Sequence, residues 1–364
     1  MSATNASTDE DEGGSFPTVR VRLEAIRENT ASVGSRFDGD LAAVTKGACG
    51  DPHVAEAMLQ GGADLLADSR IENLRRLDRR FDADLLLLRI PMASELEGVA
   101  RVADASLHSE LETIEELSAT CQHLDTTHRV IVMVDVGDRR EGVLPGDLEP
   151  FLRRADDLPG IEVAGIGTNF ACMSGLQATS GKVAELRDLV AFAESALGRA
   201  LPVVSAGGSA VLPRLEDPEG LAGVTQLRIG EGILLGTEPT EDVPVSYLRQ
   251  DAFRISAQVV ELKQKPAEPD GETAQAAFGD PPTVEDGGRQ TRAIVALGRQ
   301  DVDPSDLEPV QDGVEVIGAS SDHTVLDVSG ASPSIEVGDR LEFSPGYGSL
   351  LGSFTSPYVR PRYR

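Results

Sequence analysis

The chain has 364 residues, and its 33 Lys and Arg against 61 Asp and Glu give a formal net charge of −28, which disfavours nucleic acid as the main partner because an acidic surface repels phosphates. Hydrophobic residues make up 40%, enough for a core in about two domains, and the lack of a long apolar run or signal segment predicts a cytoplasmic protein. Cys49, Cys121 and Cys172 stand at no metal-ligand spacing, which disfavours a disulfide framework or a metal site.

The first part of the chain alternates between short apolar runs and segments with helical periodicity. Residues 1–15 are acidic and rich in Gly and Ser, which predicts a disordered tail, and residues 23–37 predict a first helix. Near-continuous apolar runs separated by amphipathic segments then predict a parallel sheet covered by helices, and their number favours closure as a (β/α)8 TIM-like barrel over residues 16–245. The eight predicted strands are 41–46, 64–69, 84–91, 103–109, 129–137, 161–168, 202–208 and 226–236.

The remainder, residues 246–364, has a different pattern. Alternating and β-branched runs are separated by turn clusters, and no segment with helical periodicity is found there. This pattern predicts a smaller C-terminal β-rich domain. Its predicted strands are 252–263, 291–298, 313–318, 323–328 and 340–343.

Polar residues at the ends of the predicted barrel strands are the candidates for chemistry, because the active site of such a barrel lies at the carboxyl ends of its strands. Lys46 ends the first strand, and a lysine desolvated there can form a Schiff base. Small and hydroxyl residues after the seventh and eighth strands, among them Ser209 and Gly230, suit a phosphate bound by backbone N–H groups. Together these features point to pyridoxal 5'-phosphate (PLP). Each one alone also fits a surface lysine or an ordinary turn.

Ten stretches carry a family resemblance: VTKGACGDP (44–52), LADSRIENL (66–74), LRIPM (88–92), SELETI (109–114), MVDVGDRREG (133–142), GIGTN (165–169), LRIGEGILLG (227–236), ALGRQDVDP (296–304), GASSDH (318–323) and TSPYV (355–359). They resemble the alanine racemase/ornithine racemase group of fold-type III PLP enzymes, most closely its ornithine-racemase-like branch. The resemblance covers nearly the whole chain after residue 16. It implies an amino-acid racemase that interconverts L- and D-amino acids by removing and returning the Cα proton. The implied substrate is ornithine or lysine, or else alanine or serine.

The resemblance also implies which residues bind the cofactor. Lys46 matches the lysine that bonds to PLP and moves the Cα proton. Ser209, together with the backbone of Gly230 and Glu231, matches the phosphate-binding positions. Tyr347 matches a C-terminal tyrosine that contacts the phosphate.

Arg228 is the most diagnostic of the matching positions. Fold-type III decarboxylases resemble this segment but carry a glutamate there, which keeps the pyridine nitrogen protonated. An arginine cannot be deprotonated and must donate to an unprotonated nitrogen, which favours racemisation over decarboxylation or transamination. Asn169, in place of a family histidine after the sixth strand, is also expected to line the cofactor site, and Arg140 to face the substrate carboxylate.

The second catalytic base is left open by the sequence. Alanine racemases have a tyrosine where this chain has Arg299, which is a poor base and a candidate to bind the substrate carboxylate. Asp301, two residues later, is a further candidate for substrate binding. Asp322 matches an aspartate on the loop that reaches the partner subunit's active site, and both Asp322 and His323 rank above Cys49 as the base. His323 fits a surface residue at the start of a strand equally well, and Cys49 fits a small buried side chain.

Two further sets of polar residues are singled out. A cationic substrate side chain would need a carboxylate, and Glu141, Glu231 or Asp301 could supply it. The string DSRIEN at 68–73 resembles the family but has no assigned chemistry, and we interpret it as a helix cap with a solvated first turn.

Two alternative functions belong to the same cofactor class. A fold-type III PLP decarboxylase or lyase is disfavoured by Arg228. A non-catalytic PLP-homeostasis protein resembles the barrel alone, so the β-rich domain at 246–364 argues against it.

The charge pattern bears on assembly and environment. Lysines are scarce, with Lys46, Lys182, Lys263 and Lys265 the complete set, and a dense carboxylate surface predicts a halophilic protein. The resemblance implies a head-to-tail homodimer with shared active sites, in which the β domain of one subunit closes the barrel mouth of the other.

Overall fold

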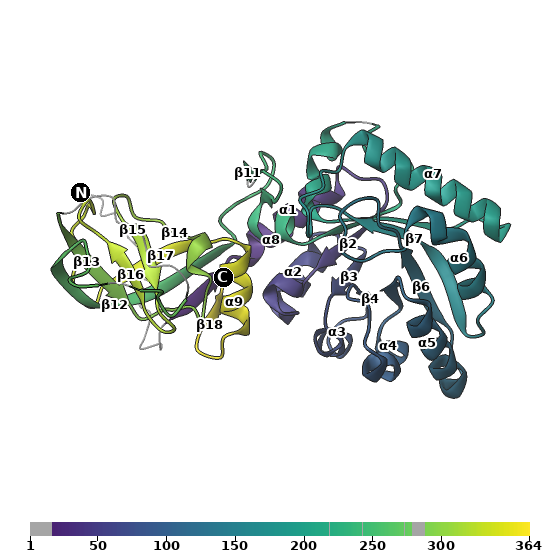
Figure 1. Ribbon diagram of the computed structural model, residues 1–364, viewed down its shortest axis with the longest axis horizontal. Coiled ribbons are helices and arrows are strands. Elements are labelled where there is room, and N and C mark those ends of the chain that lie inside the picture. The colour runs from purple at the N-terminus through teal and green to yellow at the C-terminus, as the bar shows by residue number, and fades with distance from the viewer. Residues whose placement is uncertain (1–16, 218, 242, 273, 279–287) are drawn as a thin grey trace, which may run out of the picture. The chain divides into compact units, whose positions relative to one another are not determined.

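The computed structural model describes residues 17–217, 219–241, 243–272, 274–278 and 288–364 (Figure 1). The predicted tail at 1–15 lies outside these residues. The chain divides into two compact units, which are described separately. The barrel unit comprises Val21–Phe253 and Tyr363–Arg364, and the β unit comprises Arg254–Arg362 and the segment that ends at Arg20.

The barrel unit contains a closed barrel of eight parallel strands, which confirms the predicted (β/α)8 fold. Each strand pairs with the next along the chain, and the last pairs with the first. In Figure 1 the helices lie around the outside of these strands. The strands are β2 (Asp40–Val44), β3 (Leu65–Asp68), β4 (Asp84–Leu87), β5 (Ala105–His108), β6 (His128–Met133), β7 (Ile161–Asn169), β8 (Val203–Gly207) and β9 (Gln226–Ile229).

The helices of this unit follow the amphipathic segments of the sequence. Helix α2 shows how one begins: Pro52 occupies its first position and the Asp51 carboxylate accepts the amides of His53 and Val54. The α-helices are α1 (Leu23–Gly34), α2 (Pro52–Gln60), α3 (Ile71–Asp78), α4 (Leu96–Val102), α5 (Leu111–Leu124), α6 (Leu148–Asp156), α7 (Ser180–Leu197) and α8 (Glu231–Leu235). Short 3-10 turns are η1 (Lys46–Ala48), η2 (Ala93–Glu95), η3 (Pro145–Asp147) and η4 (Ser209–Glu216). Among the residues described, no helix is long and apolar enough to span a membrane.

The barrel interior explains why its strands read as continuous apolar runs. Alternate side chains such as Ala42, Val44, Ile131 and Met133 form one buried cluster inside the barrel, while the residues between them face the helices. Both faces of each strand are therefore buried. The predicted strand at 226–236 was too long, because Gly230 interrupts it and the apolar residues that follow form α8.

The β unit is an antiparallel sheet with the strand order β14-β17-β12-β13-β16-β15. Strand β1 pairs with β12 and also with β18. The bounds are β1 (Thr18–Val21), β12 (Phe253–Pro266), β13 (Arg289–Val295), β14 (Leu307–Pro309), β15 (Glu315–Ala319), β16 (Thr324–Asp327), β17 (Arg340–Pro345) and β18 (Arg360–Tyr363), with η5 (Pro304–Asp306) and the small pair β10 (Thr237–Glu238) and β11 (Val243–Pro244) elsewhere in the chain. The β-rich domain is confirmed, with two differences. Strand β1 comes from the segment that we expected to begin the barrel, and α9 (Tyr347–Thr355) is an unpredicted helix. Its glycines and serines have low helix propensity and hide the periodicity.

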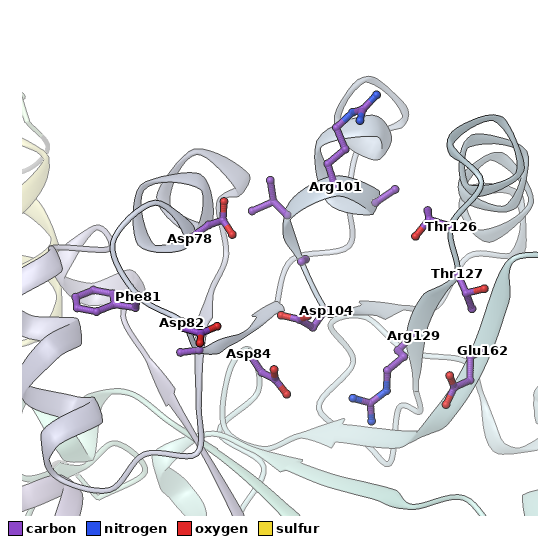
Figure 2. Close-up of a pocket in the computed structure, with 14 residues that line it drawn as sticks. Asp78, Phe81, Asp82, Asp84, Arg101, Asp104, Thr126, Thr127, Arg129 and Glu162 are labelled. Atoms are coloured by element: carbon purple, nitrogen blue, oxygen red, sulfur yellow. The ribbon is translucent and has the colours of Figure 1, made fainter.

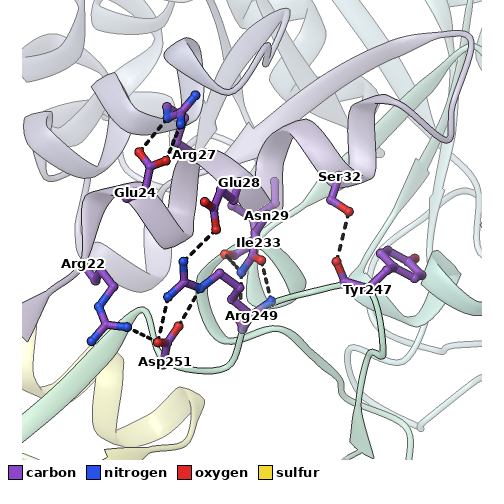
Figure 3. Close-up of polar contacts among 10 residues, drawn as sticks. All are labelled: Arg22, Glu24, Arg27, Glu28, Asn29, Ser32, Ile233, Tyr247, Arg249 and Asp251. Carbon is purple, nitrogen blue, oxygen red and sulfur yellow. Dashed lines mark hydrogen bonds and ion pairs between the residues drawn. The ribbon is translucent and has the colours of Figure 1, made fainter.

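Helix α1 is tied to the segment that leaves the barrel (Figure 3). The Asn29 side chain is 1% exposed, and its Nδ2 donates to the carbonyls of Ile233 (3.0 Å) and Arg249 (2.9 Å) while its Oδ1 accepts the Arg249 amide (2.7 Å). The Arg249 guanidinium lies between Glu28 and Asp251. The Asn29 side chain and the ion pairs of Arg249 therefore fix the position of α8, the helix that follows β9.

A buried polar cluster lies in the barrel wall on the helix-facing side of β5 and β6. The Ser106 hydroxyl is 2.9 Å from His108 Nε2 and 2.8 Å from His128 Nε2, and all three residues are at most 2% exposed. Burial lowers the pKa of His108 to about 3 and that of His128 to about 4. Both imidazoles are therefore neutral in the folded protein at neutral pH.

This cluster predicts loss of stability in mild acid. The unfolded histidines have a pKa of about 6.5, so the unfolded state binds protons first as the pH falls below that value. The histidine contribution is fully present above about pH 6.5 and is lost as the pH falls toward 4, at about 1.4 kcal/mol per pH unit for each histidine. Denaturant unfolding at a series of pH values should show a smaller slope for His108→Gln, whereas His123→Gln, at an exposed position, should match the wild type. Equal slopes for His108→Gln and the wild type would refute this account.

Candidate active site

Lys46 lies at the carboxyl end of β2, next to the carboxyl end of its neighbour β9. The register pairs Ala42 with Arg228 and Ala43 with Ile229, so the residues that follow, Lys46 and Gly230, lie at neighbouring strand ends. Lys46 begins the turn η1 directly after the barrel strand and is partly buried. This placement agrees with the predicted strand-end lysine.

The turns that follow β8 and β9 meet at the next strand ends. Gly207 pairs with Arg228, which brings Ser209 level with the start of α8, and the Ser209 hydroxyl accepts the Gly232 amide at 2.8 Å. Gly208 has φ +103°, and a Cβ there would lie 2.7 Å from the Phe170 carbonyl oxygen. A side chain at position 208 would therefore collide with the main chain that follows β7. A hydroxyl beside closely packed main chain at adjacent strand ends suits a phosphate, so the residues present fit PLP.

Arg228 is the last but one residue of β9, lies inside the barrel and is 3% exposed. Its guanidinium donates to the Thr168 carbonyl (2.8 Å), to Asn169 Oδ1 (2.8 Å) and to the Ser205 hydroxyl. Burial lowers the pKa of Arg228 to about 10, so the group stays charged at neutral pH. The acceptors are neutral oxygens from β7 and β8, as expected for a cation held in place rather than paired on the surface.

A hydrogen-bonded chain links Arg228 to a second arginine. Asn169 Nδ2 donates to Glu141 Oε1 at 2.8 Å, and Glu141 forms an ion pair with Arg140. The Asn169 amide thus contacts Arg228 through its oxygen and Glu141 through its nitrogen. The structure therefore brings Arg140, Asn169 and Arg228 together, three residues that the sequence assigned to the cofactor and substrate site.

Asp138 is a residue of this mouth that the sequence reasoning missed. It is 4% exposed and its carboxylate accepts the amides of Cys172 (3.2 Å), Met173 (3.1 Å) and Ser174 (3.1 Å). These bonds fasten the loop after β7 to the loop after β6. The motif around Asp138 gave no signal of this role, because its partners are main-chain atoms more than thirty residues away.

Asp68 corrects the interpretation of the DSRIEN string. Its carboxylate does accept the Arg70 amide at the start of α3, but the side chain is 0% exposed rather than solvated. It also accepts the Thr45 hydroxyl (2.7 Å) and the Asn73 amide (3.0 Å). Burial raises the pKa of Asp68, against the lowering effect of these donors.

In the β unit, one surface brings together Arg299, Asp322 and His323. The Arg299 amide donates to the Ser320 carbonyl at 3.0 Å, so the two loops that carry these residues are adjacent. Asp322 accepts the Ser321 hydroxyl at 3.1 Å, which lowers the pKa of the carboxyl, and His323 Nδ1 lies 3.4 Å from Asp322 Oδ1. The Asp322 and His323 side chains are exposed and can be reached by a ligand.

The other two predicted residues of this unit differ in their surroundings. Asp301 is 4% exposed and its carboxylate accepts the Gly298 amide (3.1 Å) and the Ser356 hydroxyl (2.7 Å). Both oxygens are occupied, which argues against the predicted contact of Asp301 with substrate. Tyr347 is the partly buried first residue of α9.

A pocket of about 540 Å³ lies at the opposite end of the barrel, at the amino ends of its strands (Figure 2). Asp84, Asp104, Arg129 and Glu162 line it. Active sites of (β/α)8 barrels form at the carboxyl ends, so this pocket is separate from the Lys46 site. Across the described part of the chain, no group of histidine, cysteine or carboxylate side chains is arranged to hold a metal ion.

Comparisons with known proteins agree with this arrangement. The family model described as "Alanine racemase, N-terminal domain" matches residues 21–239. The chain is 37% identical over 348 residues to the ornithine racemase of Acetoanaerobium sticklandii, covering 94% of this chain and 98% of the relative. It is also 37% identical over 352 residues to the lysine racemase of Thermotoga maritima, covering 96% and 98%.

Solved structures show the same fold. The alanine racemase of Bartonella henselae, solved with covalently bound pyridoxal phosphate, superposes with a TM-score of 0.72 at 16% identity and covers 96% of this chain and 100% of its own. The positions of Lys46 and Arg228 agree with the match in sequence, which extends over nearly the whole chain. The chain therefore belongs to the alanine racemase family and is an amino-acid racemase.

Proposed function

We propose that this racemase uses PLP bonded to Lys46 and acts on ornithine or lysine. The observation that carries the proposal is the buried Arg228 on β9. This strand pairs with β2, which leads to Lys46, and with β8, which leads to Ser209. The names of two relatives at 37% identity, an ornithine racemase and a lysine racemase, support the substrate. The related alanine racemase with covalently bound pyridoxal phosphate supports the cofactor.

The cofactor would be held by residues of the barrel mouth. Lys46 supplies the amine for the covalent bond, and the Ser209 hydroxyl with the main chain of Gly230 and Glu231 binds the phosphate. Arg228 donates to the pyridine nitrogen. Tyr347 is a further proposed phosphate contact. When bound, PLP draws electrons from the substrate Cα and makes its proton acidic.

The protein's own groups then move the Cα proton. The Lys46 amine accepts or returns it on one face of the substrate. On the other face we propose Asp322 or His323, because the ionised Asp322 carboxylate lies next to the imidazole and would orient it. Arg140 and Arg299 are the proposed partners of the substrate carboxylate. In every racemisation the proton leaves from one face and returns to the other.

The side chain of ornithine or lysine would carry a second ammonium group. Of the predicted carboxylates, Asp301 is committed to donors of the β unit. Glu141 is paired with Arg140 and Asn169, and Glu231 accepts the Thr237 hydroxyl at 3.3 Å. By the same criterion that excludes Asp301, Glu231 is the proposed partner of the substrate ammonium.

The test of the proposal is a racemisation assay. We expect the purified protein to absorb visible light through its bound cofactor and to convert L-ornithine and L-lysine into mixtures of both enantiomers, resolved by chiral chromatography. Lys46→Ala should lose the covalent cofactor and reduce turnover by at least about 10²–10⁴-fold, the range attributed to a general base. Lys263→Ala is a matched control, because that side chain is exposed and pairs only locally with Glu261.

A borohydride-reducible cofactor bond that survives in Lys46→Ala would place the attachment on another lysine. Efficient turnover of alanine or serine with none of ornithine or lysine would refute the proposed substrate.

Arg228 predicts the balance between racemisation and side reactions. Arg228→Glu should raise the fraction of transamination or decarboxylation products, because a carboxylate would keep the pyridine nitrogen protonated and prolong the carbanion. The variant should also lose about 3 kcal/mol of stability, because the new carboxylate would be buried facing the acceptors that now bind the guanidinium. Products should therefore be counted per bound cofactor, with Arg228→Gln as the uncharged control. An unchanged product ratio in Arg228→Glu with bound cofactor would contradict this role.

We also propose that the protein works as a halophilic, cytoplasmic head-to-tail homodimer, with Asp322 and His323 supplied to each barrel by the partner subunit. The formal charge of −28 on each subunit supports a dependence on salt, because dense carboxylates repel one another unless they are screened.

The dimer predicts salt-dependent association and complementation between inactive subunits. Sedimentation should show a dimer at molar salt and dissociation with loss of activity at low salt. Mixing Lys46→Ala with Asp322→Ala should restore part of the activity, since one of the two mixed sites is intact. A fully active monomer, or no recovery from two variants that both dimerise, would refute the shared site.

A further inference from the structure

We propose that Asp68 is a positioning residue for Lys46 and acts on it through the Thr45 hydroxyl. This inference rests on the proposed function of Lys46. It assigns a role to the DSRIEN string, which the sequence left without chemistry.

The geometry begins at the ends of β2 and β3. Val44 pairs with Ala67, so Thr45 and Asp68 are the next residues of neighbouring strands. Ala42, Val44 and Ala67 point into the barrel, which by alternation puts Thr45 and Asp68 on the helix-facing side of the wall. Asp68 therefore contacts the loop that carries Lys46 from behind, outside the substrate space.

Both oxygens of this carboxylate are used to join the loop to α3. Oδ2 accepts the Thr45 hydroxyl at 2.7 Å, and Oδ1 accepts the Arg70 amide and Asn73 Nδ2, each at 3.0 Å. Thr45 and Asp68 are both 0% exposed. Water cannot replace a lost partner in this position, so the contact is effectively rigid.

The same helix holds the middle of the loop. Arg76 Nη1 donates to the Cys49 carbonyl at 2.9 Å. Gly50 has φ +61°, and a Cβ there would lie 2.6 Å from the Asn73 Cβ, so only glycine lets the loop approach α3 this closely. Helix α3 thus holds the main chain of the loop that follows Lys46.

The far end of the loop is also fastened within the barrel unit. Asp51 caps α2, and its other oxygen accepts the Tyr363 hydroxyl at 2.5 Å. The Tyr363 ring stacks on His53 with centroids 4.1 Å apart. The segment from Thr45 to Asp51 is therefore fixed at its start, middle and end, and the Thr45–Asp68 bond is the contact nearest to Lys46 in sequence.

The function of such a clamp follows from what Lys46 must do. A proton-transferring amine works only within hydrogen-bond reach of Cα, and a misplacement of about 1 Å can cost about 100-fold in rate. The side chain of Lys46 is flexible, so its reach depends on a fixed main chain. Loss of the Thr45 hydroxyl should reduce the rate of proton transfer more than the binding of substrate.

The test compares two variants that each lose one buried hydroxyl. Thr45→Val keeps the shape of the side chain and removes the hydroxyl, which donates to Asp68 at 2.7 Å and also lies 3.2 Å from the Ala67 carbonyl oxygen. Ser118→Ala removes a similarly buried hydroxyl on α5, which donates to the Pro159 carbonyl at 2.6 Å, far along the chain from the loop. Thr45→Ser restores the hydroxyl, and Asp68→Ala is a harsher variant that removes an acceptor shared by three donors.

In the PLP-loaded protein we expect Thr45→Val to reduce kcat by about 10-fold to 100-fold with KM changed less than about threefold. Hydrogen exchange of the peptide that contains residues 46–51 should become about tenfold faster. Thr45→Ser should recover both values, and Ser118→Ala should leave both at the wild-type level even where its thermal stability falls as far as that of Thr45→Val.

The proposal is overturned if Thr45→Val and Ser118→Ala have the same kcat and the same loop exchange. A wild-type protein that neither binds PLP nor racemises would instead refute the proposed function, and the exchange comparison would still decide whether Asp68 holds the loop.

Discussion

The carboxyl end of the barrel is organised around one buried cation. Removing a guanidinium from water is costly unless its N–H groups are hydrogen-bonded, and Arg228 meets this condition with oxygens from Thr168, Asn169 and Ser205. These acceptors lie on β7 and β8, whereas the arginine lies on β9, so the requirement to satisfy one side chain ties three strands together. The Ser209–Gly232 bond between the turns after β8 and β9, and the Asn169–Glu141–Arg140 chain, lie next to this point.

The mouth loops share a second design. Buried polar side chains hold them: Asp68 holds the loop after β2 and Asp138 the loop after β7, while Asn29 holds helix α8 through the Ile233 carbonyl. Loops on a barrel rim are mobile unless their main-chain groups find partners. A carboxylate or amide behind the wall provides several acceptors or donors at once, so reactive side chains are presented from rigid supports.

The charge of the molecule is divided between its surface and its mouth. The chain carries a formal charge of −28, yet Lys46, Arg140 and Arg228 converge at the strand ends, and the neighbouring Asp138 and Glu141 are occupied by donors of the protein. Cationic side chains at the strand ends of an otherwise anionic protein suit the phosphate of the proposed cofactor and a substrate carboxylate, and salt screens the repulsion from the outer surface.

The sequence by itself determined the barrel, the β domain and the strand-end lysine and arginine, because hydrophobic periodicity and local motifs are encoded within short segments. It could not show that the run after Gly230 turns into α8, that Asp301 is enclosed by Gly298 and Ser356, or that Asp68 is buried against Thr45. The burial and the hydrogen-bond partners of these side chains depend on residues that are distant in the sequence. Only the tertiary structure brings such residues into contact, so a sequence pattern within a short segment does not reveal them.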